Sequence, residues 1–240
     1  MFIIFGIITG FVSGFFGVGG GMILVPLLLL YGYDMKSSVA ISIMQMVFSS
    51  IYGTLLNYKK NKSILKDGII LGVGGFIGGS LSGILVPNID GQYLKYLFFL
   101  IVLLAIVRVY LSPTEQNKNV EKQNTLSLVF IGFIIGMIAM SIGVGGSVML
   151  TPILVGYMFY NLKDASSLGL FFVIFSSLAG FISLSISGNM LYYEGFIIGI
   201  SALVGVYIGI KVKNIIKLQS YKVLILALYI LIAISILFKL

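Results

Sequence analysis

Long apolar stretches alternate with short polar connections along the whole chain. The apolar stretches cover residues 2–31, 38–58, 68–86, 93–111, 126–160, 165–187, 191–212 and 221–238. Most are about 20 residues long or longer, which is the length an α-helix needs to cross the hydrocarbon core of a bilayer. The pattern therefore predicts an all-α integral membrane protein.

The eight segments form two copies of a four-segment unit. Residues 10–26 align without gaps with residues 136–152, with identical residues at 7 of the 17 positions. The register continues at an offset of 126, later 127, through most of each half. We predict a first membrane repeat over 1–111, a polar linker over 112–125 and a second membrane repeat over 126–240.

The positions of the basic residues bear on how the two repeats face. If all eight segments cross once, the 15 Lys and Arg residues divide eight to seven between the two sides. If the first and fifth segments enter the membrane and return, only Lys36, Lys95 and Lys239 lie on one side and the other 12 lie opposite. Cytoplasmic loops are rich in Lys and Arg, which favours the second arrangement.

The glycines of the first segment fit a helix that is broken rather than spanning. As helices, residues 2–16 and 22–31 are about 22 and 15 Å long, shorter than the core of about 30 Å. Two such re-entrant helices leave three crossings in each half, so the repeats become inverted, with a cytoplasmic linker and both termini outside. Two short crossings in each glycine-rich segment give the same charge count, so that alternative stays open.

Composition narrows the class of function. Apolar residues make up 59% of the chain and charged residues 9%, and the mean hydropathy is +1.15. In such a chain the net charge of +8 marks a cytoplasmic face, and we expect no nucleic-acid partner. Cys and His are both absent, so we expect no disulfide, no metal, no cofactor and no enzymatic activity. No cleavable signal is evident, and we expect a multi-pass protein of the cell membrane.

The repeated glycine motifs are the main candidate for chemistry. They read GVGGG at 17–21 and GVGGS at 143–147, without the third glycine of a dinucleotide fingerprint or the Lys-Ser/Thr ending of a P-loop. The scattered glycines elsewhere are typical of close helix packing. A helix that starts after a break exposes N–H groups at a positive dipole end, so two breaks together predict an anion site. Its expected residues are Gly19, Gly20, Gly21, Gly145, Gly146 and Ser147.

Polar residues within the next segments complete the candidate site. Ser49 and Ser50 align with Ser176 and Ser177, whereas Gln45 aligns with a phenylalanine. A serine in a membrane helix usually hydrogen-bonds its own backbone, so each serine alone is as consistent with a structural role. The aligned carboxylates Asp67 and Glu194 are the candidates for carrying a coupling proton, although acidic residues also favour helix N-termini.

These residues resemble the sulfite exporter TauE/SafE family of membrane proteins. The resemblance rests on the pattern GxxSGxxGxGGGxxxxPxL at 10–27 and on its second copy, which departs from it with Met140 for Gly14 and Ser147 for Gly21. The resemblance covers essentially the whole chain, because the length, the number of segments and the central linker also match. It implies transport of small sulfur-containing or organic anions, such as sulfite or sulfonates.

The residues and the resemblance together favour a secondary transporter of small anions that binds its substrate between two inverted repeats. The lipid bilayer, a small anionic substrate and a coupling ion are the expected partners, and the oligomeric state stays open. A passive anion channel and a non-catalytic membrane scaffold are the alternatives. An intramembrane enzyme is disfavoured because every Asp and Glu lies near the end of a segment or in the linker.

Overall fold

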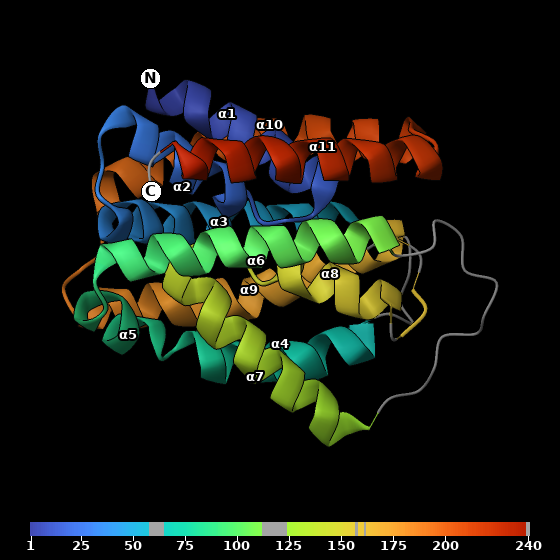
Figure 1. Cartoon of the computed structure of the whole chain (residues 1–240), viewed down its shortest axis with the longest axis horizontal. Coiled ribbons are helices and arrows are strands. Elements are labelled where there is room, and N and C mark those ends of the chain that lie inside the picture. Colours follow the sequence, from blue (N-terminus) through green and yellow to red (C-terminus); the bar gives the residue numbers. More distant parts are fainter. Residues whose placement is uncertain (58–64, 112–123, 157, 161, 239–240) are drawn as a thin grey trace.

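The chain folds as an elongated bundle of helices that lie roughly side by side (Figure 1). The computed structural model describes residues 1–57, 65–111, 124–156, 158–160 and 162–238, and these residues contain helices but no strand. The helices are α1 (Phe2–Phe16), α2 (Gly21–Tyr31), α3 (Met35–Asn57), α4 (Leu65–Gly79), α5 (Ser82–Asn88), α6 (Gly91–Leu111), α7 (Thr125–Ile142), α8 (Ser147–Gly156), α9 (Leu162–Ile186), α10 (Tyr192–Ile215) and α11 (Leu218–Leu237). The predicted all-α membrane class is confirmed.

Six helices in the described part of the chain are long and apolar enough to span a membrane: α3, α6, α7, α9, α10 and α11. The stretch predicted as one segment at 68–86 is divided into α4 and α5, which meet at an angle of 41° and would make a seventh span together. Pro87 lies inside α5. The bend falls at the run GGSLSG over residues 78–83, a glycine and serine cluster of the kind at which helices kink, which the apolar pattern alone does not register.

The first glycine-rich segment is a helical hairpin. The ring of Phe2 at the start of α1 lies 6.3 Å from the ring of Tyr31 at the end of α2, and Phe5 lies 5.8 Å from the same ring. The two helices therefore return to the end of the bundle where the chain begins. This is the shape that a re-entrant segment requires, while its depth in a bilayer stays a prediction. The corresponding α7 has 18 residues and reaches spanning length by itself.

Helices from the two halves interlock through glycine. A side chain at Gly10 of α1 would overlap the backbone carbonyl of Ala202 in α10, and one at Gly205 would overlap that of Ile7. A side chain at Gly74 of α4 would overlap the carbonyl of Val129 in α7. Only glycine permits such close backbone approach, so these glycines pack helices, as the sequence predicted for the scattered ones.

The glycine contacts also explain one departure between the two repeats. Gly14 of α1 lies against Val206 of α10, whereas its counterpart Met140 in α7 lies against Gly79 of α4. The larger residue is thus on α10 in one pair and on α7 in the other. Each pair thus combines one glycine with one larger apolar residue, although neither position is conserved between the repeats.

The two ends of the bundle differ in charge. Among the described basic residues, Lys36 and Lys95 lie near the start of α3 and α6. The opposite end, where α6 and α10 finish and α9 and α11 begin, carries Arg108, Lys163, Lys211, Lys213, Lys217 and Lys222. The hydrogen bonds from Lys163 to the Ile216 carbonyl and from Lys222 to the Tyr110 carbonyl (3.1 Å) join helix termini at this end.

Candidate functional site

The two glycine breaks meet inside the bundle. Gly17, Gly19 and Gly20 between α1 and α2, and Gly143 and Gly145 after α7, all have positive φ, which only glycine adopts readily. Gly21 lies against the carbonyl of Gly143, and a Cβ at Gly145 would be 2.8 Å from the carbonyl of Val18. The starts of α2 and α8 are therefore close together, as the sequence predicted for an anion site built from helix ends.

Gln45 of α3 presents a polar group to the first break. Its side chain is fully buried, and a Cβ at Gly20 would be 2.7 Å from its Nε2 and 2.8 Å from its Oε1. Neither amide atom has a hydrogen-bond partner. A buried amide without partners is uncommon in folded proteins and often marks a functional position.

Only one of the four predicted serines hydrogen-bonds a break. Ser49 donates to the carbonyl of Gly19 at 3.1 Å. Ser50, Ser176 and Ser177 are buried but donate to carbonyls of their own helices, at 3.4 Å each. Their hydroxyls therefore follow the structural alternative that the sequence left open.

The second break is closed by a ring where the first has an amide. Phe172, the counterpart of Gln45, lies within contact distance of Gly146, and Ile135 of α7 lies 2.7 Å from the position of a Cβ there. Gly19 lies between Met46 of α3 and Val173 of α9. At the crossing point, where the two glycine breaks meet, α3 thus contributes the amide of Gln45, whereas α9 contributes the apolar side chains of Phe172 and Val173.

Further polar residues lie at the crossing that the sequence did not single out. Ser42 of α3 donates to the carbonyl of Gly143 at 2.6 Å, and Thr151 of α8 is buried without a hydrogen-bond partner. Ser147, which the sequence did predict for the site and which begins α8, is likewise buried without a partner, and its side chain lies 2.7 Å from a Cβ position at Gly169.

Ser147 and Ser42 show a second pair of positions at which the two repeats place the larger and the smaller residue on opposite helices. In the first half the small residue is Gly21 and the hydroxyl is Ser42. In the second half the hydroxyl is Ser147 and the small residue is Gly169. The substitution of Ser147 for Gly21 is therefore accommodated by a glycine on the neighbouring helix. Ser42 can be identified from the sequence by comparing two aligned pairs of positions, 21 with 147 and 42 with 169.

A tyrosine and a carboxylate link the halves at each end of the bundle. Tyr160, just before α9, donates to Asp67 Oδ2 of α4 at 2.8 Å, and the Tyr33 hydroxyl lies 3.5 Å from Glu194 Oε1 of α10. Burial and the adjacent carboxylate raise the pKa of both tyrosines, so both stay protonated donors. The aligned carboxylates Asp67 and Glu194 thus have aligned partners.

The assembled site contains helix ends, hydroxyls and one carboxamide, and none of the residues named at the crossing is charged. Within the described ranges, no three His, Cys, Asp or Glu side chains are grouped so as to hold a metal ion. Such a set of groups can bind a small polar or anionic solute through hydrogen bonds and helix dipoles.

Comparisons with known proteins agree with this architecture. The family model described as sulfite exporter TauE/SafE matches residues 2–236. The probable membrane transporter protein MJ0441 of Methanocaldococcus jannaschii is 28% identical over 76% of this chain and 71% of its own length. The probable membrane transporter protein YunE of Bacillus subtilis is 23% identical over 97% and 94%. A probable membrane transporter protein of Haemophilus influenzae is 25% identical over 76% and 72%. With its family pattern matched from α1 to α11, this chain belongs to the sulfite exporter TauE/SafE family of membrane transporters.

Proposed function

We propose that the protein is a secondary transporter of small monovalent anions, sulfur-containing ones such as bisulfite or a small sulfonate, and that it binds them where the two glycine breaks meet. The family description points to sulfite, whereas the relatives are described only as probable membrane transporters. The chemistry of the crossing point is what narrows the substrate class.

The observation that carries this proposal is the carboxamide of Gln45. It is buried beside Gly20 with both polar atoms unpartnered. Leaving such a group unsatisfied costs about 1–3 kcal/mol, which a bound solute would recover. A protonated oxyanion offers acceptor oxygens to Nε2 and a proton to Oε1, so it matches both atoms at once.

The helix ends set the preferred charge of the solute. Each helix start contributes about half a positive charge, so α2 and α8 together balance roughly one negative charge. A dianion would leave one charge uncompensated in a buried site and would need a companion cation or proton. Monoanions are therefore the preferred form.

Alternating access follows from inverted repeats that rock around this crossing. The contacts of Tyr160 with Asp67 and of Tyr33 with Glu194 lie at opposite ends of the bundle. Each connects the turn after one hairpin to a helix of the other half, so each must loosen when its own end opens.

Isothermal titration of the purified protein with sulfite between pH 5 and 8 tests the site. Tighter binding at the acidic end is expected, because bisulfite replaces the dianion there. Stronger binding of the dianion without a coupled cation contradicts the electrostatic argument. Flux into liposomes that saturates and supports exchange identifies a transporter, whereas flux that stays linear in concentration identifies a passive channel.

A further inference from the structure

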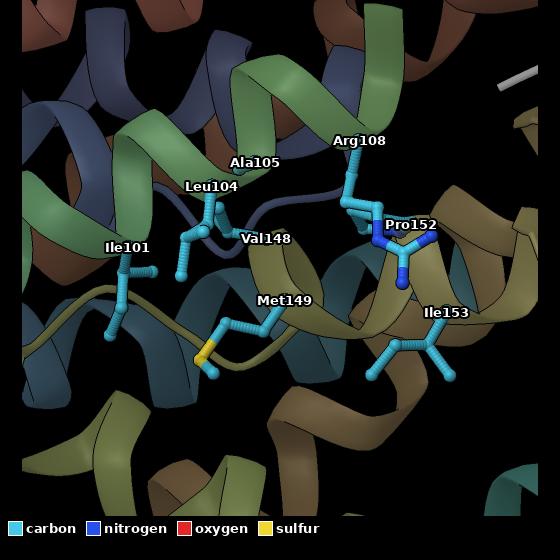
Figure 2. Close-up of a pocket in the computed structure, with 8 residues that line it drawn as sticks. All are labelled: Ile101, Leu104, Ala105, Arg108, Val148, Met149, Pro152 and Ile153. Atoms are coloured by element: carbon cyan, nitrogen blue, oxygen red, sulfur yellow. The ribbon is translucent and has the colours of Figure 1, made fainter. Parts of the chain in front are cut away.

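A groove lies between α6 and α8 and starts beside the second glycine break, since its lining residues Val148 and Met149 directly follow Ser147. Figure 2 shows side chains from the two helices facing each other across it. Its volume is about 280 Å³, and its lining residues are Ile101, Leu104, Ala105, Arg108, Val148, Met149, Pro152 and Ile153. All are apolar except Arg108.

The groove lies on the outside of the bundle. Helix α6 is a candidate span whose apolar window is only 33% buried, and Leu104 is 57% exposed. In a membrane protein an exposed apolar surface of a spanning helix faces lipid. Ile101 and Arg108 are seven residues apart, so the groove follows α6 for about 10 Å from the arginine toward the middle of the helix. These are dimensions for the upper part of an acyl chain.

Arg108 supplies a charge at the end of the groove where a lipid headgroup would lie. It is in the last turn of α6, at the basic end of the bundle, and Lys222 contacts the carbonyl of Tyr110 two residues further on. A guanidinium binds phosphate through a pair of parallel hydrogen bonds. Basic pockets between membrane helices on the cytoplasmic side are typical headgroup sites.

The other half lacks both features at the aligned positions. At the offset of 127, Ile232 of α11 corresponds to Ala105, and Ser235 corresponds to Arg108. A larger apolar side chain thus replaces the small one that makes room, and a hydroxyl replaces the charge. Of these aligned positions, only those on α6 combine a small residue with a cation.

We propose that the groove between α6 and α8 binds an anionic phospholipid, with one acyl chain against Ala105 and Met149 and the phosphate paired with Arg108. The acyl chain would lie along α8, which begins at the second glycine break. A phospholipid there would hold α8 against α6 and so stabilise the second hairpin.

Native mass spectrometry of the detergent-purified protein, titrated with phosphatidylglycerol or phosphatidylcholine, tests this site. The wild-type protein is expected to retain phosphatidylglycerol about tenfold better, because the ammonium of phosphatidylcholine offsets the phosphate charge that Arg108 attracts. Arg108→Gln, on an exposed side chain, should remove this preference, and Arg108→Lys should keep part of it. Ser235→Ala is the matched control and should bind as the wild type does.

The groove itself is tested by filling it. Ala105→Leu should weaken binding of both lipids, and Leu104→Trp, at an exposed position, serves if Ala105→Leu does not fold. Equal retention of the two lipids by the wild type overturns the proposal. So does undiminished phosphatidylglycerol binding in the filled variants, because the arginine would then act only as a surface charge.

Discussion

The two glycine breaks have similar backbone conformations but different neighbouring side chains. Both contain glycines in the left-handed region, and each lies against the residue at the same position of the following long helix. That residue is Gln45 at the first break and Phe172 at the second. One break therefore lies beside unpartnered hydrogen-bonding atoms, and the other lies beside an apolar ring.

This difference indicates how a duplicated site becomes specific. A symmetric pair of glutamines would offer a solute two amide groups with four polar atoms and would leave more of these atoms unsatisfied in its absence. In the proposed site, one amide and one ring would orient a bound solute toward α3. The aligned positions also supply matched controls, since every substitution in one half has a counterpart in the other half.

The largest effect tests whether the two breaks are inverted. In this Cys-free chain, single cysteines at Leu111 and Lys217 should both react with an impermeant maleimide from the cytoplasmic side only, and one at Asp34 only from the outside. The arrangement with eight crossings puts Leu111 and Lys217 on opposite sides. Opposite labelling of these two positions would end the inverted arrangement.

Leucine at Gly20 or Gly146 should abolish transport while expression is largely kept, because either side chain fills the crossing point. Alanine separates the two positions. Gly20→Ala should cost at least tenfold in sulfite affinity, because its φ of 84° is unfavourable for L-residues and its Cβ meets Gln45. Gly146→Ala should cost less affinity, because Gly146 does not have a positive φ and its Cβ meets the Phe172 ring instead of the Gln45 amide.

Gly32→Ala is the control for backbone strain at the first break. Its φ of 111° is also positive, but no atom lies within 4 Å of the added Cβ. Its affinity for sulfite, measured by titration, should match the wild type. Equal loss in Gly20→Ala and Gly32→Ala would mean that strain, and not access to the ligand, explains the effect.

Gln45→Leu should weaken sulfite binding by about tenfold and raise the melting temperature, because it removes an unpartnered buried amide. Phe172→Leu should lower the melting temperature, because an apolar swap in a packed core costs about 1 kcal/mol. It should change the affinity for sulfite by less than twofold. Titration calorimetry and thermal unfolding measure both quantities. Wild-type affinity in Gln45→Leu would remove the central support of the proposed site.

The smallest effect distinguishes the serines. Ser49→Ala should reduce affinity by about threefold, because the Gly19 carbonyl loses its donor and the break relaxes. Ser176→Ala should change it by less than twofold, since that hydroxyl bonds only its own helix. Equal losses in the two variants would indicate that the site uses both halves alike.

Much of this architecture could be predicted because it depends on local signals. Apolar length predicted the helices, and repeated glycines predicted where α1 and α7 end. Contacts across the interface had no such signal. Placing Met140 against Gly79, or Ser147 against Gly169, requires knowing that each helix packs on a helix from the other half or on its neighbour. The bend between α4 and α5 was missed because apolar length alone was used there, although Gly78, Gly79 and Ser80 mark the break.

The division at the linker and the substrate-binding roles of the glycines and of Gln45 stay predictions. Most of the linker, residues 112–123, lies outside the described residues, as does Lys62, which the charge pattern places on the cytoplasmic side. Pairs of aligned positions were more informative than single motifs. The exchange of Gly21 and Ser42 for Ser147 and Gly169 can be read from the alignment once one pair is known.

The packing of α1 on α10 has a consequence for biosynthesis. The glycines of α1 find their partner backbone only after residues 192–215 have left the ribosome, about 200 residues later. At 5–20 residues per second this delay is roughly 10 to 40 s. During that time the first hairpin is complete and can pack on α3, but the glycines of α1 still lack α10. Newly made chains therefore need an insertion machinery that shelters a short, glycine-faced helix until translation is nearly finished.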